Sequence, residues 1–146
     1  MTHWRVALCL MLALIAPAAR ASNTVVAVDP GFAPVASVLL QVFAEQTGHD
    51  LVLTVAPAPA LEGTAADVLL APDAALPARL AQSGRAEAGS QITYAMGPSG
   101  TAGATQPRDA VLLGQGATNP VAQSFMAFLL TPEAWDIIVS HGFGAH

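Results

Sequence analysis

The sequence contains no lysine, and its single cysteine, Cys9, lies near the N-terminus. All five basic residues are arginines, and two of them, Arg5 and Arg20, fall within the first 21 residues. The remainder carries three arginines against ten acidic residues, which gives a net charge of −7. A surface with this balance repels phosphate backbones and anionic lipids, so binding to nucleic acid or to a membrane surface is not expected.

The first 21 residues have the pattern of a secretory signal peptide. Met1–Arg5 is positively charged, Val6–Ala16 is apolar, and Ala19-Arg20-Ala21 matches an A-x-A cleavage site. The apolar run is too short to cross a bilayer, and no later run is long enough. Cleavage before Ser22 would export a single domain, 22–146, to the periplasm without any cysteine, so that neither disulfide nor thiol chemistry is expected there.

Strand and helix patterns alternate along the exported part. Apolar runs predict strands at Asn23–Val28, Leu51–Val55, Asp67–Leu70, Gln91–Met96 and Asp109–Leu113. Helical periodicity and end signals predict helices between Pro34 and Gly48 and over Ala74–Ser83, Asn119–Leu130 and Thr131–Ser140. The expected inner faces are Val35, Val38, Leu39, Val42 and Phe43 in the first helix and Trp135, Ile138 and Val139 in the last. Two segments are predicted to be loops: Ala56–Ala66 and the glycine-rich, flexible Gly97–Gln106.

This alternation predicts an α/β fold, in which a mostly parallel sheet is covered by helices on both faces. Right-handed crossovers then bring the turns that follow the parallel strands to one edge of the sheet, where a ligand is expected.

Four stretches together carry a family resemblance. They are "VAVDPGFAPVASVLLQVFAEQTGHDLVLTV", "GTAADVLLAPDAALPARL", "GSQITYAMG" and "DAVLLGQGATNPVAQSFMAFLLTPEAWDIIVSHGFG". In this order they resemble the periplasmic molybdate-binding proteins of ABC importers, which are type II solute-binding proteins. The resemblance implies a non-enzymatic binding protein whose family clamps an oxyanion between two lobes. Only residues 97–108 stand where the second lobe is inserted, so it implies a single lobe here.

The resemblance also locates a degenerate ligand site. Where the family offers Asn or Ser and then Thr in the first turn, this chain has Gly31 and Ala33 beside Asp29 and Pro30. Where a glycine followed by Ser and Thr is usual in the second loop, it has Ala56-Pro57-Ala58. The candidate ligand positions are Asp29, Gly31, Phe32, Ala33, Pro57 and Ala58.

Asp29 is the most informative of these positions. A carboxylate before a helix is often a capping group, and we expect Asp29 to cap the helix that follows. With no arginine or lysine expected nearby, it would repel an oxyanion. Asp73 is expected to cap the next helix, Asp67 to be structural, and Phe32 to pack against its helix.

Two functions remain open, and an enzyme is not expected. No cysteine nucleophile and no G-x-S-x-G turn is present, and His49, His141 and His146 are too scattered to predict a metal site or a cofactor. The first hypothesis is an exported binding protein that holds molybdate or tungstate weakly, alone or as a homodimer that rebuilds a cleft. The alternative is a periplasmic accessory module that kept the scaffold, lost the ligand and binds a protein partner through the small apolar residues at the same edge.

Overall fold

The computed structural model describes residues 23–98 and 103–144. The predicted signal peptide lies outside the described residues. The elements in chain order are β1 (Thr24–Val28), α1 (Ala33–Thr47), β2 (Leu51–Val55), α2 (Ala58–Leu61), β3 (Val68–Leu70), α3 (Ala75–Gln82), β4 (Ile92–Pro98), β5 (Thr105–Leu112), a 3₁₀ turn (Gly116–Thr118), α4 (Pro120–Phe128) and α5 (Pro132–Ser140). Within these described ranges, no helix has the length and apolar character needed to cross a bilayer.

The five strands form one mixed sheet in the order β2-β1-β3-β5-β4. β1 pairs in parallel with β2 and with β3, whereas β5 runs antiparallel to both β3 and β4. Four strands therefore share one direction and only β5 is reversed. This confirms the predicted α/β fold with a mostly parallel sheet.

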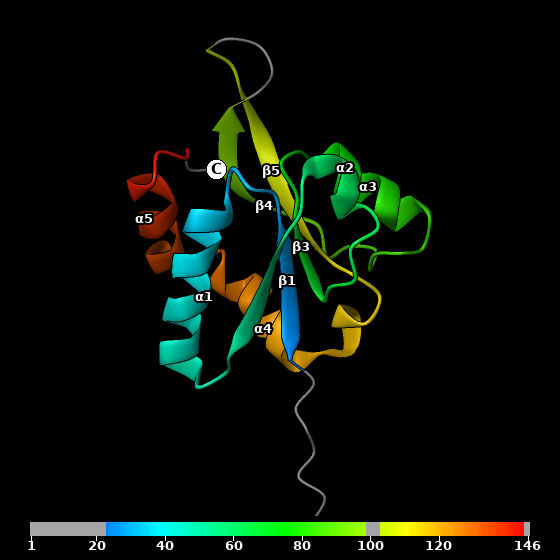
Figure 1. Ribbon diagram of the computed structural model, residues 1–146, viewed down its shortest axis with the longest axis horizontal. Coiled ribbons are helices and arrows are strands. Elements are labelled where there is room, and N and C mark those ends of the chain that lie inside the picture. The colour runs from blue at the N-terminus through cyan, green and yellow to red at the C-terminus, as the bar shows by residue number, and fades with distance from the viewer. Residues whose placement is uncertain (1–22, 99–102, 145–146) are drawn as a thin grey trace, which may run out of the picture.

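Helices cover both faces of the sheet (Figure 1). α1, α4 and α5 lie on one face, over a core that includes Val26, Leu39 and Phe125. α2 and α3 lie on the other face, over a smaller core that includes Leu69 and Leu80. Alternate residues of each central strand point to opposite faces, so Val68 and Leu69 enter different cores.

The helices begin and end where the local signals predict. Gly48 ends α1 in the left-handed region, with φ +75°, a conformation that glycine adopts at little cost. The Asn119 side chain accepts hydrogen bonds from the Val121 and Ala122 N–H groups at the start of α4. The Thr131 hydroxyl accepts one from the Ala134 N–H at the start of α5.

The inner face of α5 differs from the prediction. Ile138 is buried as predicted, and Ala134 is buried beside it, whereas Trp135 and Val139 are 36% and 49% exposed. The helix is rotated by about one position relative to the predicted face. It packs mainly on one neighbour, α1, and such a short contact buries a single stripe of side chains at i and i+4.

Two predicted loops also contain regular structure. Ala58–Leu61 forms the single helical turn α2, which places Leu61 in the smaller core. In the glycine-rich segment, Gly97 pairs with Gln106 and Pro98 with Thr105. Both strands of the β4–β5 hairpin therefore continue into the predicted loop. Cross-strand pairing overrides the local glycine and proline signals here, and the segment expected to connect β4 to β5 flexibly is shorter than predicted.

Candidate functional site

The turns after β1, β2 and β3 meet at the carboxyl end of these parallel strands, and the β4–β5 hairpin extends beyond the same end of the sheet (Figure 1). Asp29 follows β1, Ala56 follows β2 and Ala71 follows β3. The first two turns are adjacent, because the Ala56 N–H donates to the Val28 carbonyl at 3.0 Å. The fold therefore brings the two predicted ligand loops together.

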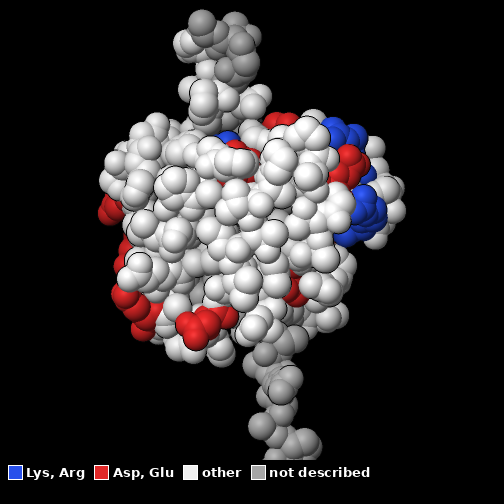
Figure 2. Space-filling view, in the orientation of Figure 1, with Lys and Arg blue, Asp and Glu red and all other residues white. Residues whose placement is uncertain are grey.

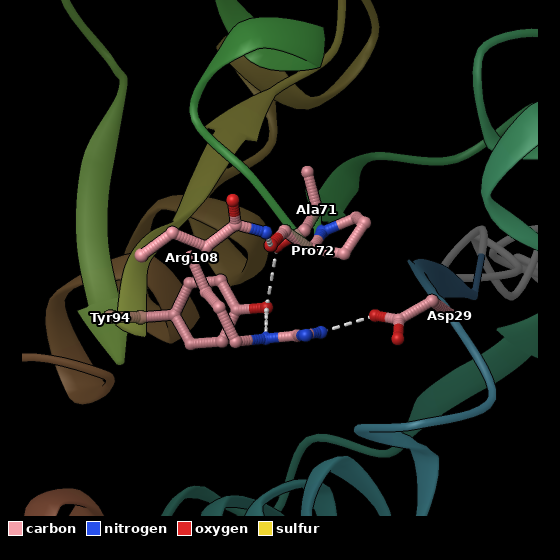
Figure 3. Close-up of polar contacts among 6 residues, drawn as sticks. Asp29, Ala71, Pro72, Tyr94 and Arg108 are labelled. Carbon is pink, nitrogen blue, oxygen red and sulfur yellow. Dashed lines mark hydrogen bonds and ion pairs between the residues drawn. The ribbon is translucent and has the colours of Figure 1, made fainter. Parts of the chain in front are cut away.

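Asp29 pairs with Arg108 of β5, and the pair is buried (Figure 3). An Arg108 guanidinium nitrogen donates to Asp29 Oδ1, and Arg108 and Asp29 are only 5% and 8% exposed. The expectation that no arginine lies near Asp29 is therefore wrong. β5 is separated from β1 by β3 in the sheet, and the long Arg108 side chain spans that gap.

Asp29 also does not cap α1, contrary to the prediction. Phe32 is the residue at the N-cap, and its side chain accepts no hydrogen bond from the first turn. The Asp29 backbone carbonyl accepts the Phe32 N–H at 3.3 Å instead. The carboxylate turns towards Arg108 because a buried guanidinium stabilises it more than a partial helix charge does.

Tyr94 completes the polar arrangement at Arg108. Arg108 Nε donates to the Tyr94 hydroxyl oxygen at 3.1 Å, and the Tyr94 O–H donates to the Ala71 carbonyl at 2.9 Å (Figure 3). This chain of bonds links β4, β5 and the turn after β3. Burial raises the pKa of Tyr94 well above its ordinary value, and the nearby Arg108 only partly offsets this effect.

Aromatic rings surround the guanidinium. The Arg108 guanidinium carbon lies 5.0 Å from the centre of the Phe32 ring, 5.4 Å from that of Phe143 and 5.9 Å from that of Tyr94. Phe32 packs edge-on against both other rings and is fully buried, which confirms that it packs in the core. A cation among three rings and a carboxylate is held in place and shielded from water.

The remaining predicted positions offer few donors to an anion. Gly31, Pro57 and Ala58 are exposed and Ala33 is half-buried, but none carries a hydroxyl. Pro34 at the start of α1 lacks an N–H, which removes one donor from the first turn of that helix. The loops at this end of the sheet are close together, yet the side chains at these positions provide no hydrogen bonds for an oxyanion.

Other acidic residues have structural partners. Asp73 Oδ1 accepts the Leu76 N–H at 2.9 Å, which confirms its predicted capping role. The Asp67 carboxylate accepts hydrogen bonds from the Val25 N–H and the Asn119 side-chain amide, at the amino end of β3. Asp109 accepts hydrogen bonds from Gln91 and Thr93. In the part of the chain that the structure describes, no three His, Cys, Asp or Glu side chains gather as metal ligands would.

The sequence interpretation missed Arg108 and Tyr94. One signal for Arg108 was available, because it directly precedes the predicted strand 109–113 and is one of only three arginines after residue 21. A lone arginine beside a buried strand indicates an acidic partner. The identity of that partner depends on strand order, which local pattern does not give.

The fold matches known solute-binding proteins. The periplasmic molybdate-binding protein of Azotobacter vinelandii superposes with a TM-score of 0.76 at 16% identity, over 85% of this chain and 100% of that chain. A protein described as the substrate-binding domain of a putative molybdenum ABC transporter from Clostridium difficile gives 0.74 at 7% identity, over 85% and 99%. PEB3 with bound L-phospholactate gives 0.65 at 12% identity, over 85% and 100%. These likenesses show the fold.

Sequence comparison gives the family. No curated protein matches the chain significantly. The family model described as "Bacterial extracellular solute-binding protein" matches residues 24–107, more than half of the chain and nearly all of the segment from β1 to the end of the hairpin. The chain thus belongs to the bacterial extracellular solute-binding proteins, a non-enzymatic family, and is related in fold to molybdate-binding proteins.

Proposed function

We propose that this chain is an exported binding protein with a degenerate oxyanion site, a single solute-binding lobe whose ligand turn is closed by its own carboxylate. The observation that carries the proposal is the buried ion pair between Asp29 and Arg108. Among the described residues, Arg108 is the one cation at the end of the sheet where the predicted ligand loops meet. Its charge is already compensated by Asp29.

The pair removes the electrostatic reason for an oxyanion to bind. Two unit charges about 4 Å apart interact by about 4 kcal/mol at an effective dielectric constant near 20. An oxyanion between Asp29 and Arg108 would gain that attraction from the guanidinium and lose a similar amount to the carboxylate. The missing hydroxyls at Gly31, Ala33, Pro57 and Ala58 leave no side-chain donor there to favour the ion.

A single lobe weakens the site further. An ion on an open edge keeps contact with water, so its interactions with the protein are screened. Binding of molybdate or tungstate would therefore be weak unless two copies face each other and enclose the ion.

Calorimetry with molybdate, tungstate and sulfate tests the proposal. The wild-type chain should show no binding tighter than the millimolar range, which corresponds to about −4 kcal/mol. Submicromolar binding of molybdate by the monomer would reject the degenerate site and assign the chain to solute capture.

A pair of variants tests the effect of the Asp29 carboxylate on anion binding separately from the effect of having a single lobe. Asp29→Asn leaves Arg108 buried without its counter-charge, so molybdate or sulfate should raise the melting temperature of this variant. Asp73→Asn is the matched control, because it removes a carboxylate that only caps α3, and its melting temperature should not respond. If Asp29→Asn folds and does not respond either, Asp29 is not what closes the site.

Export is part of the proposal. The A-x-A sequence at Ala19-Arg20-Ala21 should direct cleavage before Ser22. Mass spectrometry of the periplasmic fraction should find a chain that begins at Ser22. A chain that still begins at Met1 would contradict the cleaved signal.

A second candidate function is that of a periplasmic accessory module. It is favoured by the apolar surface next to the closed turn, where Val55 is 48% exposed and Pro57 and Ala58 are exposed. A protein partner gains more from such a surface than an anion does. The calorimetry distinguishes the two candidates, because an accessory module shows no anion binding in the wild type at any accessible concentration.

A further inference from the structure

The two edge strands of the sheet, β4 and β2, differ in how well they are protected against pairing with another chain. β4 is protected, because Met96 exchanges two backbone hydrogen bonds with Gly144, at 2.9 and 2.8 Å. A register irregularity between Thr93 and Ala95 and the terminal Pro98 interrupt the edge further. Bulges, prolines and covering segments are the means by which proteins prevent an edge strand from pairing with another chain.

β2, the other edge strand, has none of these protections among the described residues. Its sequence, LVLTV, contains no charge and no proline, and in the sheet it pairs with β1 alone. The Ala56 N–H donates to Val28 of β1, and peptide groups alternate in direction along a strand. The N–H and C=O groups of Leu51, Leu53 and Val55 therefore face away from β1, towards the free edge.

A groove runs along this edge between β2 and α1. Its volume is about 480 Å³, and it is lined by Ser37, Leu40, Gln41, Ala44, Glu45, Asp50, Leu51 and Leu53. Three leucines and Ala44 form the apolar part of the lining, while Glu45 and Asp50, both exposed, give it a negative charge. No arginine or lysine is among the lining residues.

We propose that the β2 edge binds an extended, cationic segment of a partner protein as an added strand. The outward backbone groups of Leu51, Leu53 and Val55 would pair with the segment, and the groove would take its apolar side chains. Lysine or arginine side chains of the segment would meet Glu45 and Asp50. Backbone pairing provides affinity in this mode of recognition, and side-chain pockets provide specificity. The proposal does not depend on whether the turn at Asp29 binds an oxyanion.

The charge distribution favours a different protein over a second copy of this chain. The exposed arginines of the described residues, Arg79 and Arg85, lie on or just after α3, beyond the far face of the sheet. Figure 2 shows this separation, with basic residues over α3 on the right and acidic residues gathered at the lower left, on the side of α1. No described strand of this chain presents an exposed cation, so a second copy lacks the complementary charge.

Peptide binding tests the proposal directly. The probe is a synthetic peptide of about nine residues, longer than the five residues of β2. Threonine occupies every second position, and the positions between hold valine and lysine in turn, so that valine and lysine share the face that meets the groove. It should bind the chain, and the affinity should fall when salt rises from about 0.05 M to about 0.5 M. A peptide with glutamate in place of lysine should bind at least about tenfold more weakly.

Variants of the chain locate the site. Glu45→Gln with Asp50→Asn should weaken binding of the lysine peptide about tenfold, whereas Glu87→Gln, at an exposed acid away from the groove, should leave it unchanged. Val55→Pro removes an outward N–H without touching the bonds to β1 and should also weaken binding. Val55→Ala is the control, because it shortens the same side chain and keeps the N–H. Urea denaturation of each variant shows that it is folded.

Two results would overturn the proposal. Equal binding of the lysine and glutamate peptides would contradict the charge argument. Equal binding by Val55→Pro and Val55→Ala, when both fold, would contradict strand addition. Light scattering adds a further check: a wild-type dimer that Val55→Pro dissociates would assign the edge to a second copy instead.

Discussion

Arg108 reaches Asp29 across the carboxyl end of β3, although the two residues are 79 positions apart in the chain. The bridge ties the β4–β5 hairpin to the turn between β1 and α1. In this bridge the negative charge of Asp29 compensates the positive charge of Arg108. The same interaction therefore links distant parts of the fold and lies beside the predicted ligand loops.

Removing the guanidinium should destabilise the fold strongly. Arg108→Met leaves the Asp29 carboxylate buried without a partner, and we expect a loss of about 3–5 kcal/mol in the free energy of unfolding. The double variant Arg108→Met with Asp29→Leu should recover much of this loss, since it removes both charges. Arg79→Met, which breaks an exposed pair with Glu62 at 4.0 Å, should change stability by at most about 1 kcal/mol. Urea denaturation measures all three, and a similar loss for Arg108→Met and Arg79→Met would contradict the structural role of the buried pair.

Tyr94 should make stability depend on alkaline pH. Its folded pKa is raised by burial, so the unfolded chain releases the phenol proton near pH 10 while the folded chain retains it. Stability is therefore full below about pH 10 and falls as the pH rises above it. The chain has one tyrosine and no lysine, so few other side chains titrate in this range.

Ultraviolet absorbance of tyrosinate measures this directly. The folded chain should show no tyrosinate signal at about pH 10, and the urea-unfolded chain should be about half ionised there. In Tyr94→Phe the fall in stability above about pH 10 should disappear. The variant should also lose about 1–3 kcal/mol at neutral pH, because Ala71 O and Arg108 Nε lose a partner. Half-ionisation of the folded wild type at about pH 10 would show that Tyr94 is accessible to water.

The two faces of α5 should respond differently to truncation. Ile138 is fully buried whereas Trp135 is 36% exposed. We expect Ile138→Ala to cost about 2–5 kcal/mol, and Trp135→Ala to cost less than Ile138→Ala despite removing a larger side chain. Thermal or urea unfolding decides between them, and a larger loss at Trp135 would restore the face that the sequence predicts.

Gly97 should resist substitution because of Arg108. A Cβ at Gly97 would lie 2.7 Å from Arg108 Cδ, so Gly97→Ala should displace the arginine and cost about 1–3 kcal/mol. Gly63→Ala is the matched control, because a Cβ there meets nothing within 4 Å and its φ is not positive. The control should stay within about 0.5 kcal/mol of the wild type. A neutral Gly97→Ala would show that Arg108 does not need this close approach.

Much of the fold could be predicted because its signals are local. The apolar run at Leu51–Val55 and the caps at Asn119 and Thr131 lie within the segments they define, and the structure reproduces them. The alternation of strands and helices predicts an α/β sheet, and the four family-like stretches indicate the relatives that the comparisons then show. Local dihedral preferences and side-chain periodicity depend on neighbouring residues, so the sequence by itself determined these features.

The partner of Asp29 was decided only by the tertiary structure. Nothing near Asp29 in the chain reveals Arg108. Their proximity depends on the strand order, which places a single strand, β3, between β1 and β5. The strands at the glycine-rich hairpin and the rotation of α5 likewise arise from pairing and packing with distant segments. Burial makes the ion pair outweigh helix capping at Asp29, and burial is a property of the assembled fold that no local pattern contains.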